Sequence, residues 1–318
     1  MELVNEKPVM ALHKAFWKNY GSLFGLAAIC IVLTLMSDRF MTVSNLVNIA
    51  RQVSINTIIA VGMTLVIITG GIDLSVGSLV ALSGCVAIMT MELPGADVTG
   101  IILGLAVAAG AGLFSGVLVA YGKIPPFITT LAMLTIARGA ALVITAGQPQ
   151  VRFDTAYRVL GEGTVGPVPV PIVIMALVLL VASFILKHTP LGSYIYATGG
   201  NEEAARLSGI KISRVKALVY SISGFCAGIS GLVLAARLGS AQPNTGTGFE
   251  LDAIAAVVLG GTSLMGGRGT IWGTLIGALI IGVLNNGFNL LNVSPYYQLI
   301  AKGSVIILAV LLDQFLRR

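Results

Sequence analysis

The residues of this chain that could carry out catalysis are few and poorly placed for it. The only histidines are His13, before the first apolar segment, and His188, beside a charged segment, so neither a zinc site nor a histidine-based triad can form among the apolar segments. Asp73 is the only plausible carboxylate within an apolar segment, whereas catalysis by paired aspartates in a membrane would need two. Three cysteines lie far apart, without the spacing of metal ligands, and we expect them to be inert packing residues: Cys30, Cys85 and Cys226. These patterns argue against an enzyme and against a metal site.

The chain also lacks a nucleotide-binding loop, which needs Gly-x-x-x-x-Gly-Lys followed by Ser or Thr. The nearest approach, Gly261 to Gly266 followed by Gly267 and Arg268, has neither the lysine nor the hydroxyl. Energy for uphill transport would therefore come from another subunit or from an ion gradient, and we expect no cofactor in this chain.

An ion-coupled carrier would need acids or acid–base pairs in its spans. Arg138 lies in the middle of an apolar segment and should face the interior of a helix bundle or water. It could form a structural ion pair with Asp73 or Asp252, or act as a coupling group. Glu250 and Lys302 are the other candidate ionisable residues within or at the edge of apolar segments, and together these residues keep an ion-coupled carrier open as an alternative.

Amide and hydroxyl side chains suit a polar, uncharged solute because they replace water's hydrogen bonds without demanding a charge. Asn285, Asn286 and Asn289 lie in one apolar segment, and their spacing places Asn285 and Asn289 on one helical face. A second polar stretch lies nearby, at Gln242, Asn244, Thr245 and Thr247. Asparagines can also hold helices together in lipid, so these residues could either line a solute path or join neighbouring helices.

The pattern Gly-Gly-x-x-Leu-x-x-Gly occurs twice, from Gly70 and from Gly260, each time between two apolar stretches. Glycine-interrupted segments at related places in two halves indicate a transporter's substrate path, where unwound backbone lines a cavity. Chance similarity in a chain with 39 glycines is the alternative. The residues that we assign to the candidate path are these and the three asparagines: Gly70, Gly71, Asp73, Ser75, Gly260, Gly261, Asn285, Asn286 and Asn289.

Other glycines lie four residues apart within apolar segments, where they let helix backbones approach closely in lipid. We expect them to be packing devices: Gly112 and Gly116, Gly224 and Gly228, and Gly273 and Gly277.

Charge gathers in one segment, from Lys187 to Lys216, which holds 7 of the 32 Asp, Glu, Lys and Arg residues. Residues 201–209 have the parts of a short, complete helix. Asn201 can cap the free N–H groups, Glu202 and Glu203 suit the positive N-terminal end, and Gly209 can take the left-handed closing position. A solvated connecting helix explains the pattern as well as a docking element does.

The composition requires a membrane to position these residues. Charged residues are 10% of the 318, against about 25% in soluble domains, and 56% are hydrophobic. We predict an all-α integral membrane protein with one membrane domain over 1–318 and a cytoplasmic loop at 188–214. About ten segments have the length of a span, the eighth being short: 19–36, 53–70, 75–92, 98–121, 126–146, 168–187, 215–238, 251–265, 270–292 and 296–315.

The distribution of Lys and Arg predicts the orientation, because cytoplasmic loops carry the excess. With the N-terminus inside, 12 of the 19 fall inside and 5 outside, with Arg138 and Lys302 within spans. Both termini and the charged segment should therefore face the cytoplasm, and the net charge of +6 needs no nucleic acid to explain it. Both glycine motifs then lie on the cytoplasmic side, which suits a parallel repeat, whereas an inverted repeat would place them on opposite sides.

Three motifs in this order resemble the permease subunits of bacterial ABC sugar importers: residues 60–78, the segment Gly199-Gly-Asn-Glu-Glu-Ala-Ala-Arg-Leu-Ser-Gly209, and residues 251–263. The resemblance covers the chain from about Phe16 to Asp313. It is closest to members that carry ribose, through the segments 284–291 and 296–298, although permeases for related monosaccharides share much of the pattern.

This resemblance implies a fold similar to the vitamin B12 importer permeases, two copies of the chain, and a bacterial cytoplasmic (inner) membrane. It implies a separate ATPase subunit that binds ATP and Mg²⁺, and a periplasmic or extracellular sugar-binding protein. An ion-coupled secondary sugar transporter is the alternative. Carried over by position, the ATPase-coupling helix would be formed by Asn201, Glu202, Glu203, Ala204, Ala205 and Gly209.

Overall fold

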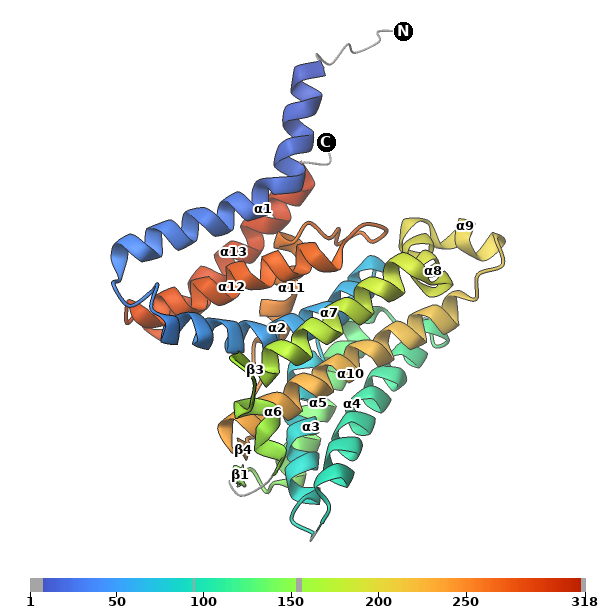
Figure 1. Cartoon of the computed structure of the whole chain (residues 1–318). Coiled ribbons are helices and arrows are strands. Elements are labelled where there is room, and N and C mark those ends of the chain that lie inside the picture. Colours follow the sequence, from blue (N-terminus) through green and yellow to red (C-terminus); the bar gives the residue numbers. More distant parts are fainter. Residues whose placement is uncertain (1–7, 94, 153–155, 316–318) are drawn as a thin grey trace.

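The computed structural model describes residues 8–93, 95–152 and 156–315. This part of the chain is almost entirely helical (Figure 1). The α-helices are α1 (Pro8–Met36), α2 (Val43–Ile68), α3 (Val76–Thr90), α4 (Asp97–Ala120), α5 (Pro126–Ile144), α6 (Val159–Glu162), α7 (Val170–His188), α8 (Pro190–Gly200), α9 (Glu202–Leu207), α10 (Ile212–Leu238), α11 (Phe249–Leu259), α12 (Ile271–Leu290) and α13 (Pro295–Phe315). The short elements are β1 (Gln150–Val151), η1 (Ala156–Arg158), β2 (Thr164–Val165), β3 (Val168–Pro169) and β4 (Ser240–Ala241).

Each of the ten apolar segments expected from the sequence contains a helix, although α11 ends at Leu259 within the segment 251–265. Among the described residues, six helices are long and apolar enough to cross a membrane: α2, α4, α5, α7, α10 and α12. Helices α3 and α11 have 15 and 11 residues, or about 22 and 16 Å, which is less than the roughly 30 Å of a hydrocarbon core. The prediction of an all-helical membrane protein is confirmed, while ten as the number of spans stays a prediction. Three basic residues counted for the orientation, Lys7, Arg317 and Arg318, lie outside the described residues.

Small residues let several helices pack backbone against backbone. Helices α4 and α10 share the most extensive contact. A Cβ atom added at Gly112 would lie 2.3 Å from the carbonyl oxygen of Tyr220, and one at Gly224 would lie 2.3 Å from that of Ala108. Gly277 is equally tight against the carbonyl oxygen of Ala256, at 1.9 Å. The expectation that these glycines are packing devices is therefore confirmed.

Helix α3 begins in the middle of the bundle rather than at one end. The Asp73 carboxylate, just before α3, accepts a hydrogen bond from the Ser223 hydroxyl at 2.8 Å, and Ser223 lies close to the middle of α10. Further along, the Ser83 hydroxyl donates to the carbonyl of Gly228 at 3.1 Å. Helix α3 therefore runs beside α10 in the same direction, from mid-height to the end opposite α9.

Helix α11 begins next to the start of α3 and runs the other way. A Cβ atom at Gly77 would lie 2.3 Å from the carbonyl oxygen of Gly246, and one at Gly246 would lie 2.3 Å from that of Gly77. The far end of α11 packs at Gly260 against Gly273, near the start of α12. The N-termini of two half-length helices thus meet at mid-height, and irregular backbone reaches them from both ends of the bundle, over residues 69–75 and 242–248.

Two small antiparallel pairings close the end opposite α9. Strand β1 pairs with β4, and β2 pairs with β3. Between them the Tyr157 hydroxyl donates to the carbonyl of Leu232 in α10, which holds the 3-10 helix η1 against the bundle.

Candidate coupling and transport sites

The charged segment contains the short helix that the sequence predicts. The Asn201 side chain accepts a hydrogen bond from the backbone N–H of Ala204 at 2.9 Å and caps α9. Gly209 has φ of +85°, its N–H donates to the carbonyl of Arg206 at 3.0 Å, and the N–H of Ile210 donates to that of Ala205 at 3.1 Å. These paired bonds are a Schellman closure. The predicted N-cap and left-handed closing glycine are both confirmed.

Helix α9 stands away from the bundle (Figure 1). Of its six residues only Ala205 is buried, whereas Leu207 is 79% exposed. Glu203 bonds to Arg206 at 2.6 Å within the helix, and this hydrogen bond and charge raise the pKa of the Arg206 guanidinium above its ordinary value. Glu202 pairs with Lys216 at 2.7 Å and so ties α9 to α10. An exposed apolar tip on a capped, tethered helix is suited to contact with another protein.

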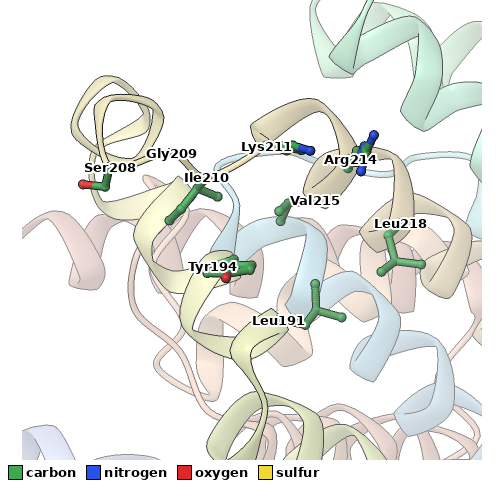
Figure 2. Close-up of a pocket in the computed structure, with 9 residues that line it drawn as sticks. All are labelled: Leu191, Tyr194, Ser208, Gly209, Ile210, Lys211, Arg214, Val215 and Leu218. Carbon is green, nitrogen blue, oxygen red and sulfur yellow. The ribbon is translucent and has the colours of Figure 1, made fainter.

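A pocket of about 460 Å³ lies between α8 and α10, next to α9 (Figure 2). Most of its wall is apolar or aromatic, two cations stand on one side, and no carboxylate is among the residues that line it. The lining residues are Leu191, Tyr194, Ser208, Gly209, Ile210, Lys211, Arg214, Val215 and Leu218.

The C-terminal end of α8 connects this region with both glycine motifs. A Cβ atom at Gly199 would lie 1.7 Å from the carbonyl oxygen of Ile68 and 2.6 Å from the nitrogen of Gly267. The N–H of Gly267 itself donates to the carbonyl of Ile68 at 2.8 Å. One turn earlier, the Tyr196 hydroxyl donates to the carbonyl of Gly269 at 2.8 Å. We call this contact of α8 with residues 68 and 266–269 the glycine junction.

The two glycine motifs lie at the same end of the bundle and close their helices in the same way. The N–H groups of Gly70 and Gly71 donate to the carbonyls of Ile67 and Val66, and Gly70 has φ of +80°. After α11 the left-handed residue is Gly261, with φ of +84° and the same pair of bonds. Because Gly70 aligns with Gly260 in the sequence pattern, the structural match is displaced by one residue from the sequence match.

Asp73 is a fully buried carboxylate held by serines. One carboxylate oxygen accepts the backbone N–H of Ser75 at 3.0 Å and its hydroxyl at 2.6 Å, and the other accepts the Ser223 hydroxyl. Arg138 instead donates to the backbone carbonyls of Pro243 and Thr245. Arg138 forms no ion pair with Asp73 or Asp252 in the described structure, because these two carbonyls bind one of its guanidinium nitrogens while Asp73 is held by serines and Asp252 by Lys302.

Asp252 pairs with Lys302 at 2.9 Å, a contact between α11 and α13 that the sequence pattern did not indicate. Both residues were visible as charges in apolar segments, but nothing in their spacing connects two residues that are fifty positions apart.

The three asparagines of α12 each bond to a neighbouring element. Asn285 donates to Asp252 at 3.5 Å, Asn286 exchanges two hydrogen bonds with Asn45 of α2, and Asn289 accepts one from Gln298 at 3.1 Å. These contacts hold α12 against α11, α2 and α13. That these residues also line a solute path stays a prediction.

The irregular segment 242–248 carries polar side chains that point away from the bundle core. Gln242, Asn244 and Thr247 are exposed in the isolated chain, although the segment descends to mid-height. The sequence indicated its polarity but not that it re-enters the bundle.

Comparison with known proteins identifies relatives over nearly the whole chain. The family model described as branched-chain amino acid transport system / permease component matches residues 45–310. The chain is 51% identical over 304 residues to the ribose import permease protein of Escherichia coli strain K12, which covers 94% of this chain and 95% of that protein. It is 50% identical to the ribose import permease protein of Bacillus subtilis strain 168, over 92% of each chain. It is 41% identical to the D-allose transport system permease protein of Escherichia coli strain K12, over 95% of this chain and 94% of that one.

No solved structure matches the chain. The resemblance to import permeases inferred from the sequence motifs is confirmed. A family match over most of the chain, together with relatives that share half of their residues over nearly their full length, shows that this protein belongs to the branched-chain amino acid transport system / permease component family.

Proposed function

We propose that this chain is the membrane permease subunit of an ATP-driven sugar importer whose cargo is ribose or a closely related monosaccharide. The observation that carries this proposal is the identity of about half with ribose import permeases from two bacterial species, against 41% with the allose permease. The family description names branched-chain amino acids, but the full-length relatives at high identity carry sugar names, and these decide the class of cargo.

The motor belongs to a separate ATPase subunit, which binds ATP and Mg²⁺ and docks on α9. The exposed, capped and tethered form of α9 supports this role, since a rigid helix can transmit a push that a flexible loop would absorb. Asn201 and Gly209 fix its two ends, and Glu202 ties it to Lys216 of α10. Glu203 pairs with Arg206 within the helix, the exposed Ala204 leaves room for close approach of a partner, and the buried Ala205 packs α9 against its own chain.

Motion of α9 reaches the transport path through the glycine junction. Helix α8 precedes α9 with only Asn201 between them, and its end at Gly199 contacts both motif loops at once. A displacement of α8 therefore moves the end of α2 and the segment after α11 together. These segments lead to the mid-height meeting of α3 and α11, where irregular backbone of the kind found in transporter paths lies.

The path itself runs beside segment 242–248 and is completed by a second copy of the chain. Exposed polar side chains at mid-height support this arrangement, because irregular backbone and polar groups do not face lipid within a bilayer. A sugar-binding protein on the outer side delivers the cargo. The excess of Lys and Arg beside α9 favours a cytoplasmic location for α9 and for both termini, in a bacterial inner membrane.

Reconstitution tests the function. Proteoliposomes with this chain, its ATPase and its sugar-binding protein are expected to accumulate labelled ribose in the presence of ATP and to lose this uptake when the ATPase is omitted. Unlabelled allose should compete with labelled ribose less well than unlabelled ribose does. An ion-coupled transporter, for which the partly buried Asp252–Lys302 pair is the relevant feature, would instead accumulate sugar without the ATPase and stop on addition of a protonophore. That second outcome would overturn the proposal.

A further inference from the structure

The pocket between α8 and α10 has the chemistry of a lipid site. Figure 2 shows Lys211 and Arg214 on one side of it and Leu191 and Leu218 on the other. A ligand that fills both parts must carry a negative charge at one end and hydrocarbon at the other. The volume of about 460 Å³ lies within the range of small-ligand sites.

The two cations are available to such a ligand. Both glutamates of the charged segment are engaged elsewhere, Glu202 by Lys216 and Glu203 by Arg206. In the described part of the chain neither Lys211 nor Arg214 has an ion-pair partner, and both side chains are exposed. The pocket therefore keeps two uncompensated positive charges.

The position of the pocket selects a membrane lipid over a soluble anion. Helix α10, which is long and apolar enough to span a membrane, begins at Ile212, so Lys211 and Arg214 stand at its first turn and Leu218 stands about one turn beyond Arg214. Leu218 and Tyr194 are 44% and 42% exposed. Basic pockets between membrane helices at the boundary with water are sites for anionic lipid headgroups, and tyrosine favours the same level.

We propose that this pocket binds one anionic phospholipid, with its phosphate against Lys211 and Arg214 and an acyl chain along Leu191 and Leu218. The site would attach the α8–α9 unit to the lipid at its side. It depends on membrane insertion and not on the identity of the transported solute.

Native mass spectrometry of the purified full chain, released from nanodiscs of phosphatidylglycerol and phosphatidylcholine in equal parts, tests the proposal. The wild-type chain is expected to retain one phosphatidylglycerol in preference to phosphatidylcholine. Because each basic residue near a membrane surface contributes about 1 kcal/mol, Lys211→Gln with Arg214→Gln should weaken this retention about 20- to 30-fold. Leu218→Ser should weaken it as well, since it removes part of the apolar wall.

The matched control removes the same charge from the same end of the bundle. Lys123→Gln with Lys187→Gln, whose side chains are exposed but do not line the pocket, should change retention by less than about threefold. Equal retention of the two lipids by the wild-type chain would overturn the proposal, as would equal losses in the two double variants. Displacement of the lipid by millimolar inorganic phosphate would assign the pocket to a soluble anion. Loss of ATPase binding without loss of lipid would assign it to a protein partner.

Discussion

At the scale of single residues, Asp73 is a buried carboxylate that depends on hydrogen bonds from its neighbours. It accepts three hydrogen bonds, two from Ser75 and one from Ser223, and these bonds join the start of α3 to the middle of α10. Asp73→Ala would leave three buried donors without an acceptor, each at a cost of about 1–3 kcal/mol. We expect Asp73→Ala to lower the midpoint of thermal unfolding in detergent clearly more than Ser223→Ala, which removes one bond. Equal melting of the two variants would show that the carboxylate is not the centre of this network.

Gly199 offers a second prediction at this scale, because its neighbour supplies the control. A Cβ atom at Gly199 would collide with the carbonyl of Ile68, whereas one at Gly200 would meet nothing within 4 Å. Overpacking of this kind costs about 1–3 kcal/mol, so Gly199→Ala should destabilise the chain and Gly200→Ala should not. If the glycine junction transmits motion, Gly199→Ala should also lower ribose uptake per ATP hydrolysed by about tenfold in proteoliposomes. Normal coupling in a Gly199→Ala protein that still inserts would contradict that role.

At the scale of elements, α9 makes the sharpest test because its closing residue has open space around it. Gly209 has φ of +85° and no atom within 4 Å of an added Cβ, so the first effect of a substitution is backbone strain and not a clash at Cβ. Leucine in the left-handed region costs about 1–2 kcal/mol, whereas asparagine tolerates it. We expect Gly209→Leu to uncouple ATP hydrolysis from ribose uptake without loss of insertion, and Gly209→Asn to stay close to wild type. Unchanged uptake by Gly209→Leu would count against α9 as the coupling helix.

The caps and packing glycines of these elements could be predicted from the sequence because their causes are local. The signal for α9 lies within nine residues, from the Asn201 cap to Gly209, and the glycines four apart in α4 and α10 are visible on one helical face. The ten apolar segments likewise follow from runs of hydrophobic residues, and each contains a helix.

The half-length helices and the junctions between them could not be predicted, because hydrophobicity does not report where a helix stops in depth. The glycine motif indicated irregular backbone from Gly70, but residues 242–248 look like an ordinary connection between segments. Nothing in either sequence shows that both enter the bundle and bring Gly77 against Gly246. The contacts of Gly199 with Ile68, and of Asp252 with Lys302, join residues 131 and 50 positions apart. The sequence alignment of the two glycine motifs differs by one position from their structural alignment. The left-handed residue is set by where each helix ends and not by the position of the glycine pair.

At the scale of the whole molecule, the exposed polar face of segment 242–248 requires a neighbour or water. Asn244 and Thr247 are exposed, while α7 presents apolar residues such as Leu177, which is 62% exposed. Lipid can cover the apolar surface of α7 but not the polar surface of segment 242–248, because unsatisfied polar groups in hydrocarbon cost several kcal/mol each. The two surfaces should therefore face different environments in the assembled transporter.

Thiol labelling separates these environments. In a chain whose Cys30, Cys85 and Cys226 are replaced by alanine, Thr247→Cys should react with a membrane-impermeant maleimide from one side of a proteoliposome, and Leu177→Cys should not. Because alternating access moves the path between the two sides, addition of the ATPase with ATP should change the rate for Thr247→Cys by about fivefold or more, and a short bismaleimide should link two copies through it. Thr247→Cys that reacts no faster than Leu177→Cys, with or without nucleotide, would place segment 242–248 against lipid or sealed protein. The transport path would then lie elsewhere in the molecule.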